Sequence, residues 1–369
     1  MSPKEIIEKL ASEADIKIDG DKPWDIRVHN EELYDRVIRH GSLGLGESYM
    51  DGWWDAESLD EFFNKLLKAG FTGKIPMNTS FVLGYLRQRF LNIQKGHSFE
   101  IGERHYDIGN DIYESMLDKR LTYTCAYWKE AKTLDEAQEA KLDLVCRKLG
   151  IKKGQKVLDI GSGWGSFMGY AAEKYGAECV GVTVSKKQVD YANKRYAHLP
   201  VETRLTDYRD INGQFDHVVS LGMFEHVGHK NYRFYMKKVR ELLKDGGLFL
   251  LHTIGKNVSN TYADPWISRY IFPNSIIPSA KQIADSSEGL FVMEDWHNFG
   301  ADYDATLIDW FKNFDTAWPK LKAKYGQRFY RMWKYYLLMS AGSFRCRKNQ
   351  LWQTVFSKDG VPGGYRSAR

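Results

Sequence analysis

The sequence lacks any long hydrophobic run. Its longest apolar stretches, residues 247–251 and 335–342, are far shorter than the roughly 18–20 residues that a membrane-spanning helix needs. No hydrophobic signal segment opens the chain, because its first five residues lead into a charged amphipathic stretch. We therefore expect a cytoplasmic protein without a transmembrane helix.

Cysteine is also scarce, and the four cysteines include no pair with CxxC spacing. They are Cys125, Cys146, Cys179 and Cys346. This pattern argues against a disulfide framework and a cysteine zinc site, so we expect reduced thiols. His226 and His229 are three residues apart, but no cysteine or carboxylate pair completes a site, and we expect no bound metal.

The composition that is present favours a folded protein of two domains. The chain has 369 residues, of which 43% are hydrophobic and 14% aromatic, enough to bury a sizeable core. We expect a small N-terminal α/β domain at 1–75, a linker at 76–100 and a larger domain at 101–369. Helices are expected over 4–14 and 31–39, with a linking helix over 81–94.

Two further signals lie in the N-terminal part. Four glycines between residues 41 and 52 punctuate the stretch after the second helix. Ser58 and Glu61 have the spacing of a capping box before an amphipathic helix that carries Phe62, Phe63 and two leucines. Those apolar side chains could touch apolar chains of a ligand, or pack on the rest of the protein or in a dimer interface.

Regular alternation of strands and helices begins near residue 133, where Thr133 and Glu136 form a capping box. Strands are expected at 156–160, 178–184, 201–205, 215–221 and 247–254, with helices between them, including one over 230–243. Two late strands, 291–297 and 351–356, are expected to close an antiparallel edge. The pattern predicts an α/β fold with a mostly parallel sheet covered on both faces.

A glycine loop joins the first of these strands to its helix, in the sequence VLDIGSGWG at 157–165. Glycines let the backbone approach a ligand closely, and the helix N-terminus supplies N–H groups. Sites for NAD, nucleotides and S-adenosylmethionine all use such loops. The G-x-G-x-G spacing and Asp159 before the first glycine favour S-adenosylmethionine. The second strand ends at Thr183 without the acidic residue that holds the ribose in NAD sites, and many S-adenosylmethionine sites also have such an acid there, so the residue that contacts the ribose stays open.

Charge is distributed unevenly. Residues 1–100 hold 13 Lys and Arg against 17 Asp and Glu, whereas residues 311–369 hold 13 Lys and Arg against two acids. The basic segment is also rich in aromatic residues. This mixture suits an anionic membrane surface or a nucleic acid backbone. A solvated basic helix whose aromatic residues face the core would give the same pattern.

Six further motifs stand in order along the chain: GSLGLGESYMDGWW at 41–54, HYDIGND at 105–111, YTCAYW at 123–128, GMFEHVG at 222–228, LLHTIG at 250–255 and DWHNFGADY at 295–303. With the glycine loop, they resemble bacterial cyclopropane-fatty-acyl-phospholipid synthases over nearly the whole chain. The resemblance implies a Rossmann-like class I methyltransferase fold with a seven-stranded sheet. It also implies methylation of a cis double bond in a phospholipid by S-adenosylmethionine, with bicarbonate-assisted deprotonation and closure to a cyclopropane ring.

The resemblance also implies which residues form the site. The bicarbonate ion and the chemistry are assigned to Cys125, Glu225, His252, Ile254 and Tyr303. The cofactor is assigned to Tyr123, Thr124, Asp159, Gly161, Ser162, Gly163, Trp164, Gly165, Thr183, Gln188, Asp207, Tyr208 and Arg209. The chain departs from the family at Ser340, where a cysteine is often found. The chemistry gives that thiol no task, so we expect activity without it.

The residues themselves support this chemistry. Glu225 follows one expected strand and His252 lies late in another, so both border the ligand crevice of an open α/β sheet. A carboxylate and an imidazole can hold bicarbonate by accepting and donating hydrogen bonds. Direct deprotonation by Glu225 is the competing possibility. Aromatic faces that could stabilise a cation, or simply pack in the core, belong to Tyr123, Tyr127, Trp128, Phe224 and Tyr303.

We expect a phospholipid bilayer surface as the partner, with anionic lipids favoured and the basic 311–369 segment as the contact. The protein would then be peripherally associated with the inner face of the membrane. We also expect a homodimer and no nucleic acid partner. A methyltransferase of soluble molecules or nucleic acid, and a non-catalytic lipid-binding protein with a retained cofactor fold, are the alternatives.

Overall fold

The computed structural model describes residues 1–70 and 109–369, which form two compact units. The first unit comprises residues 1–70, 261–274 and 303–349; the second comprises residues 109–260, 275–302 and 350–369. The expected linker at 76–100, the helix at 81–94 and residues 105–108 of the HYDIGND motif lie outside the described residues. The expected division near residues 75–100 therefore stays a prediction.

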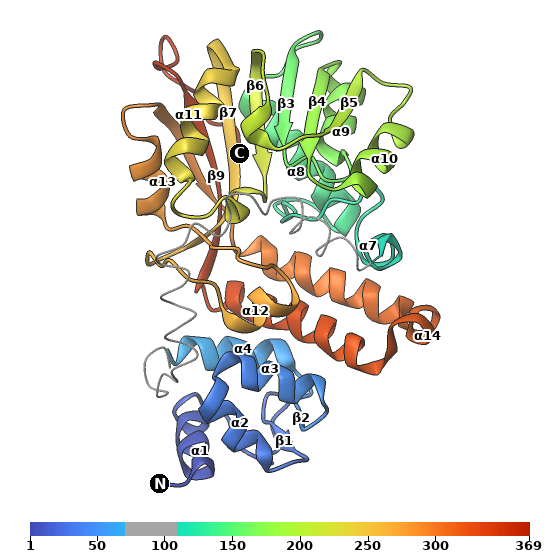
Figure 1. The fold of residues 1–369 in the computed structure, drawn as a ribbon, viewed down its shortest axis with the longest axis vertical. Helices are drawn as coiled ribbons and strands as arrows, with labels where there is room; N and C mark the ends of the chain where they lie inside the picture. Colours follow the sequence, from blue (N-terminus) through green and yellow to red (C-terminus); the bar gives the residue numbers. More distant parts are fainter. Residues whose placement is uncertain (71–108) are drawn as a thin grey trace. The chain divides into compact units, whose positions relative to one another are not determined.

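The second unit is built on one seven-stranded sheet with the order β5-β4-β3-β6-β7-β9-β8 (Figure 1). The strands are β3 (Lys156–Ile160), β4 (Glu178–Thr183), β5 (Val201–Leu205), β6 (Phe215–Leu221), β7 (Leu243–Lys256), β8 (Val292–Asn298) and β9 (Asn349–Ser357). β3 to β7 pair in parallel, and β8 pairs antiparallel with β9. The expected mostly parallel sheet with an antiparallel edge is confirmed.

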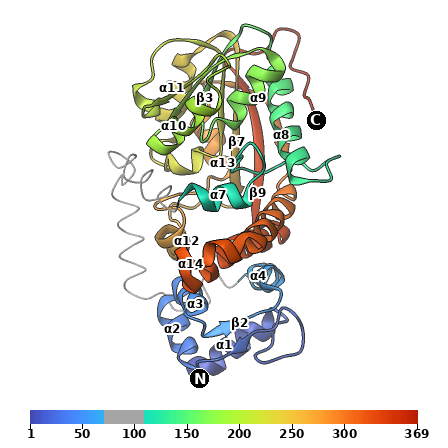
Figure 2. The same cartoon turned by 90° about the vertical axis from the view of Figure 1, so that its right-hand side faces the viewer.

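Helices cover both faces of this sheet (Figure 2). On one face, α8 (Leu134–Leu149) and α9 (Ser166–Tyr175) pack on Val157, Val219 and Leu250. On the other, α11 (Tyr232–Leu242) and α13 (Ala280–Ser287) pack on the alternate residues of the same strands. Because side chains alternate across a strand, apolar residues at consecutive positions give both faces a core.

Short elements follow the strands on the edge where the parallel strands end. The chain enters α9 after β3, α10 (Lys186–Arg195) after β4, η1 (Tyr208–Asp210) after β5 and η2 (Phe224–His226) after β6. A further helix, α7 (Asn110–Met116), precedes α8. Strand order reverses around β3, where β4 lies on one side and β6 on the other. Open α/β sheets bind ligands at the carboxyl ends of strands beside such a point.

The first unit is mainly helical. Its N-terminal elements are α1 (Pro3–Glu13), β1 (Arg27–Val28), α2 (Glu32–His40), α3 (Ser42–Met50), β2 (Trp54–Asp55) and α4 (Leu59–Lys68), and its later elements are α12 (Pro265–Tyr270) and α14 (Asp302–Arg345). Phe62 and Phe63 are buried against Trp54 and Tyr335, with ring centroids 5.1 and 5.0 Å apart. These two phenylalanines therefore serve packing within the unit.

Two local features of this unit differ from the sequence expectation. The glycine-rich stretch forms α3, because Gly44 lies against the backbone oxygen of Arg36 and Gly46 lies against the indole of Trp266, where a Cβ would not fit. Ser58 precedes α4, but its side chain makes no capping hydrogen bond, so the expected capping box is wrong. Glu61 instead accepts hydrogen bonds from Asn64 and Arg345.

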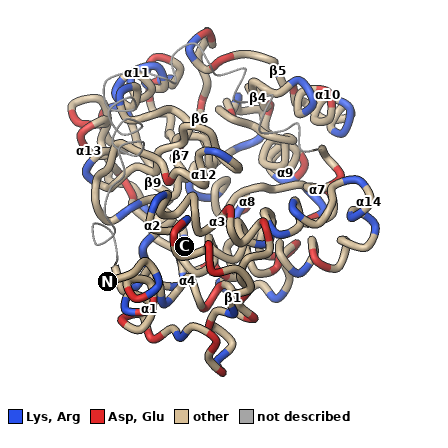
Figure 3. Tube along the Cα trace, turned by 60° about the horizontal axis from the view of Figure 1, so that its bottom comes forward, with Lys and Arg blue, Asp and Glu red and all other residues tan. Residues whose placement is uncertain are grey.

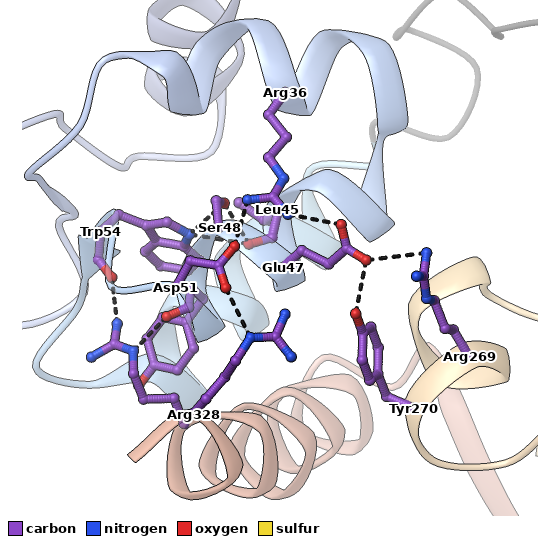
Figure 4. Close-up of polar contacts among 11 residues, drawn as sticks. Arg36, Leu45, Glu47, Ser48, Asp51, Trp54, Arg269, Tyr270 and Arg328 are labelled. Atoms are coloured by element: carbon purple, nitrogen blue, oxygen red, sulfur yellow. Dashed lines mark hydrogen bonds and ion pairs between the residues drawn. The ribbon is translucent and has the colours of Figure 1, made fainter. Parts of the chain in front are cut away.

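A polar network joins α3 to α12 and α14 within the first unit (Figure 4). Glu47 accepts from Arg36 at 2.9 Å and from the Tyr270 hydroxyl at 2.8 Å, and it lies 3.3 Å from Arg269. Asp51 accepts from Arg36 at 2.7 Å and from Arg328 at 2.9 Å. Because Arg36 belongs to α2, these charge-assisted hydrogen bonds fix four helices, α2, α3, α12 and α14, relative to one another.

α14 consists of two helical arms joined at Gly326, whose backbone is not helical (φ 74°, ψ 164°). The arms lie side by side (Figure 1), and aromatic rings connect them: Tyr303 stacks on Phe344 with centroids 4.5 Å apart, and Phe314 stacks on Tyr330 at 5.8 Å.

No helix in the described ranges, 1–70 and 109–369, has both the length and the apolar character needed to cross a bilayer.

The basic 311–369 segment is divided between the two units. Most of its arginines are engaged with acids: Arg345 with Asp304 and Asp60, and Arg331 with Asp55. Lys320, Lys322 and Lys324 are exposed beside the turn between the arms of α14, whose Lys and Arg positions are marked in Figure 3. Several aromatic residues of the segment are buried core: Phe314, Trp333, Tyr335 and Tyr336.

Candidate active site

The glycine loop after β3 is held tightly against β4. The backbone N–H groups of Gly161 and Ser162 both donate to the carbonyl oxygen of Val182, at 2.9 and 3.0 Å. Gly161 has φ +87°, and a Cβ there would lie 2.7 Å from that of Met223. Only glycine fits this turn without strain. Gly163 and Gly165 also have positive φ, so all three glycines of the loop adopt a backbone conformation that other residues rarely take.

The ends of β4 and β5 place the next group of expected cofactor residues on the same edge. Thr183 donates from Oγ1 to Oε1 of Gln188 at 2.7 Å, and the buried Nε2 of Gln188 has no partner within the described part of the chain. Asp207 caps η1 and holds the Arg209 guanidinium at 2.7 and 2.6 Å. Tyr208 packs on Tyr235 with ring centroids 5.1 Å apart.

Two buried ionisable side chains next to the loop, Asp159 on β3 and Lys141 on α8, influence each other electrostatically. Burial raises the pKa of Asp159 to about 7, and the nearby Lys141 partly offsets this effect. Burial lowers the pKa of Lys141 to about 8. Lys141 donates to Oγ1 of Thr124 at 2.6 Å, and Gln138, one turn earlier on α8, donates to the Thr124 carbonyl at 2.8 Å. These two α8 side chains fix the segment that carries Tyr123, Thr124 and Cys125.

Glu225 and Ile254 meet where β6 and β7 end. Oε1 of Glu225 accepts the backbone N–H of Ile254 at 2.7 Å, and the buried Oε2 has no hydrogen-bond partner among the described residues. Burial raises the pKa of Glu225 to about 7, although the Ile254 N–H favours the charged form. A carboxyl group that titrates near neutrality can hold or exchange a proton under physiological conditions.

His252 is on β7, two residues before Ile254, and only 1% of it is exposed. Its carbonyl accepts the N–H of Gly222 at 2.8 Å, which ties it to the loop that leads to Glu225. Nδ1 lies 3.3 Å from the amide nitrogen of Gln353 on β9, and Nε2 has no partner among the described residues. Burial holds the pKa of His252 well below its usual range, so the ring is neutral.

The remaining expected residues of the second unit lie in packed surroundings. Cys125 is fully buried, and its thiol donates to the Ala126 carbonyl at 3.2 Å. Tyr123 and Trp164 both contact the ring of Tyr113, with centroids 5.2 and 4.9 Å away. Phe224 is stacked on Tyr232 at 4.3 Å, which supports its alternative role in the core.

Tyr303 belongs to the other unit, and its assignment to the reaction remains a proposal. It lies in the first turn of α14, where its ring stacks on Phe344 and meets the edge of Trp310. In the second unit, the carboxylate of Asp302 accepts the N–H of Trp128 at 2.7 Å.

In the described part of the chain, no cluster of three or more His, Cys, Asp or Glu could hold a metal ion.

Sequence reasoning did not identify Lys141 and Gln353. Both carried a signal: Lys141 stands beside Leu142 on the apolar stripe of its helix, and Gln353 interrupts the hydrophobic run of a late strand. A polar group on an otherwise apolar face is normally buried with a partner. The partners themselves, Thr124 and His252, could not be identified without the fold.

Comparison with known proteins agrees with this arrangement. The family model for Mycolic acid cyclopropane synthetase matches residues 93–354. The cyclopropane-fatty-acyl-phospholipid synthase of Escherichia coli (strain K12) is 52% identical over 365 residues, which covers 99% of this chain and 95% of that protein.

Solved structures of cyclopropane synthases resemble this chain as well. The cyclopropane synthase MmaA2 from Mycobacterium tuberculosis superimposes with a TM-score of 0.66 at 30% identity, covering 70% of this chain and 98% of that chain. The mycolic acid cyclopropane synthase CmaA1, complexed with SAH and CTAB, gives the same TM-score, identity and coverage. These neighbours confirm the expected class of fold. The chain therefore belongs to the family of cyclopropane-fatty-acyl-phospholipid synthases and mycolic acid cyclopropane synthases.

Proposed function

We propose that the protein converts a cis double bond of an unsaturated phospholipid acyl chain into a cyclopropane ring, with S-adenosylmethionine as methyl donor. The main observation behind this proposal is that Glu225, Ile254 and His252 form a buried cluster. This cluster lies at the same edge of the sheet as the glycine loop. Similarity to the E. coli phospholipid synthase over 99% of the chain supports the same substrate class.

The residues present fit S-adenosylmethionine. Gly163 has open space where a Cβ would stand, so a ligand can approach the backbone closely there. Buried polar atoms on Asp159 and Gln188 lack partners in the described part of the chain. Unsatisfied buried polar atoms beside a glycine loop are typical of a polar ligand site. When bound, the cofactor supplies an electrophilic methyl group. The chain's part is to hold it close to the alkene in a site from which water is excluded.

Glu225 and His252 supply hydrogen bonds of opposite kind. The ionised Glu225 accepts through Oε2, while Ile254 keeps Oε1 in place. The neutral His252 donates through one ring N–H. Bicarbonate has both a proton to donate and oxygens to accept, so it fits this pair. When bound, it would supply the base that takes a proton from the added methyl group, and the electrons of that C–H bond would close the ring. Cys125 and Tyr303 remain members of the proposed site.

The experiment that tests the activity follows the methyl carbon. The protein is incubated with S-adenosylmethionine labelled in the methyl group and with vesicles of a cis-unsaturated phospholipid, nucleic acid or small amines. We expect label in the lipid alone. Label in nucleic acid or amines, with none in lipid, would favour the soluble-substrate alternative.

The membrane partner is proposed from charge. Lys320, Lys322 and Lys324 lie exposed beside half-buried Tyr325 and Phe329, a combination that suits an anionic lipid surface. We assign this turn of α14 to contact with anionic headgroups at the inner face of the membrane. Sedimentation with vesicles tests this: binding should rise with anionic lipid content and fall with salt, and salt-insensitive binding would count against it.

We also propose a homodimer. Several N-terminal acids pair with arginines of the later segment within one chain, but exposed acids such as Asp21 and Glu57 are complementary in charge to exposed basic side chains of a second copy. Analytical ultracentrifugation of the full chain tests this, with a sedimenting mass of twice 42.8 kDa expected. A monomer at all accessible concentrations would refute it.

A further inference from the structure

Gln353 is a buried polar residue for which the proposed reaction has so far given no role. It lies in the middle of β9, the strand next to β7 in the sheet, and it is 0% exposed. Its amide nitrogen is 3.3 Å from Nδ1 of His252, and its amide oxygen has no partner within the described residues. A buried amide costs stability where its hydrogen-bonding atoms are left without partners.

The chemistry of the two groups defines the contact. An amide nitrogen can only donate, so Nδ1 of His252 must accept and carry no proton. A neutral imidazole has one N–H, and burial together with the positive charges of Lys141 and Lys148 keeps this ring neutral. The single proton is therefore on Nε2, the ring atom that has no partner among the described residues.

We infer that Gln353 is a positioning residue that fixes His252 as the Nε2–H tautomer and so turns its imidazole into a hydrogen-bond donor toward the reacting centre. The inference rests on the proposed function and deepens it. It assigns His252 the task of holding an anion, and excludes this imidazole as the base. In histidine sites generally, the partner of one ring nitrogen decides what the other can do.

The opposite orientation of the amide gives the opposite chemistry. If the amide oxygen of Gln353 faced Nδ1, that nitrogen would carry the proton, and Nε2 would be a lone-pair acceptor able to remove a proton. The two orientations therefore differ in a measurable quantity, the site of protonation on one ring. This quantity does not depend on whether the chain makes cyclopropanes.

The direct test is nitrogen-15 NMR of the full chain with labelled histidine, in which His252→Gln identifies the signals of His252. We expect a protonated Nε2 and an unprotonated Nδ1 for this ring between pH 6 and 8. A protonated Nδ1 would overturn the inference, even if the protein proved to be an active cyclopropane synthase. Failure of cyclopropanation would instead count against the proposed function and leave the NMR result decisive for Gln353.

Variants supply the second arm. Gln353→Glu keeps the size of the side chain but offers an acceptor to Nδ1, which favours the Nδ1–H tautomer of His252. We expect kcat to fall by about 100-fold or more, while the KM for S-adenosylmethionine changes less than about twofold. Thr354→Val is the matched control, because Thr354 is the next buried residue of β9 and points to the opposite face. It should retain wild-type kcat. Equal losses in the two variants, or full activity of Gln353→Glu, would overturn the inference.

Discussion

The backbone N–H of Ile254 donates a 2.7 Å hydrogen bond to Oε1 of Glu225, and this contact joins β7 to the short helix that follows β6. It orients the carboxyl group so that one oxygen is occupied and the other remains available in a buried site. Because the donor is a backbone group on a central strand, substitution of the Ile254 side chain leaves it in place. The contact thus fixes the Glu225 carboxylate through the sheet itself.

The first prediction concerns the pH dependence of Glu225. If its carboxylate must accept a hydrogen bond during turnover, kcat should fall as pH drops through about 7, the value to which burial raises its pKa. Glu225→Gln should lose nearly all activity at every pH. A Glu225→Gln variant with substantial activity, or a flat wild-type profile between pH 6 and 8, would contradict this role.

The same shift predicts a cost in stability. The folded protein binds more protons than the unfolded chain between about pH 4.5 and 7, so the free energy of unfolding should fall as pH rises through this range. Each pKa unit corresponds to about 1.4 kcal/mol, which sets an upper limit of about 3 kcal/mol. Glu225→Gln should be more stable than the wild type at pH 8, as urea unfolding would reveal. A variant that is less stable than the wild type at pH 8 would show that burial of the ionised Glu225 carboxylate does not destabilise the folded protein.

The third prediction uses two glycines with positive φ. Gly161→Ala and Gly154→Ala should each cost about 1 kcal/mol or more, because alanine is disfavoured in this backbone region. Only Gly161→Ala also places a methyl group against Met223, in the loop proposed to bind the cofactor. Calorimetry should therefore show at least a tenfold loss of S-adenosylmethionine affinity for Gly161→Ala alone. A similar loss in Gly154→Ala would mean that the effect is not local.

The fourth prediction concerns the lysines of α14. Replacing Lys320, Lys322 and Lys324 by Gln should weaken binding to anionic vesicles by about 3 kcal/mol, roughly 100-fold, because each lysine near such a surface contributes about 1 kcal/mol. The matched control replaces Lys152, Lys153 and Lys174, three exposed lysines before β3 or at the end of α9. An equal effect of both triple variants would indicate net charge alone, without a defined contact.

The fifth prediction concerns the network around Glu47 (Figure 4). Glu47→Gln weakens its interactions with Arg36 and Arg269, so α3 should open more easily by about 1–3 kcal/mol. Hydrogen exchange of α3 amides should then be about 5- to 100-fold faster. Asp35→Asn removes an exposed ion pair with Arg39 on α2 and should have little effect. Unchanged exchange in Glu47→Gln would show that the network adds no stability.

The central sheet could be predicted from sequence because its signals are local. β3, β5 and β6 have the expected boundaries, and β7 extends beyond its expected range to residues 243–256. Buried parallel strands appear as short apolar runs, and the capping box at Thr133 and Glu136 forms as expected. Most of the residues assigned to the cofactor by resemblance fall at the ends of successive strands, where the topology brings them to one edge, whereas Tyr123 and Thr124 precede α8 and Gln188 lies in α10.

The parts that escaped prediction depend on contacts distant in sequence. α3 contains glycines at the positions that Arg36 and Trp266 approach closely. No local sequence pattern predicts that approach. The partner of Gln353 is 101 residues away, at His252, so periodicity could show a buried amide but not its role. The reversal at Gly326 lies within a pattern that otherwise indicates continuous helix on both sides.

The most direct test of the account is mass spectrometry of a cis-unsaturated phospholipid after incubation with the protein and S-adenosylmethionine, with bicarbonate present or removed. We predict a gain of one CH₂ per converted double bond, in a product that resists mild hydrogenation, with turnover that depends on bicarbonate. A product that takes up hydrogen would be a methylene or other unsaturated derivative, and bicarbonate-independent turnover would make Glu225 the base. No mass gain, with the cofactor bound, would contradict the central claim.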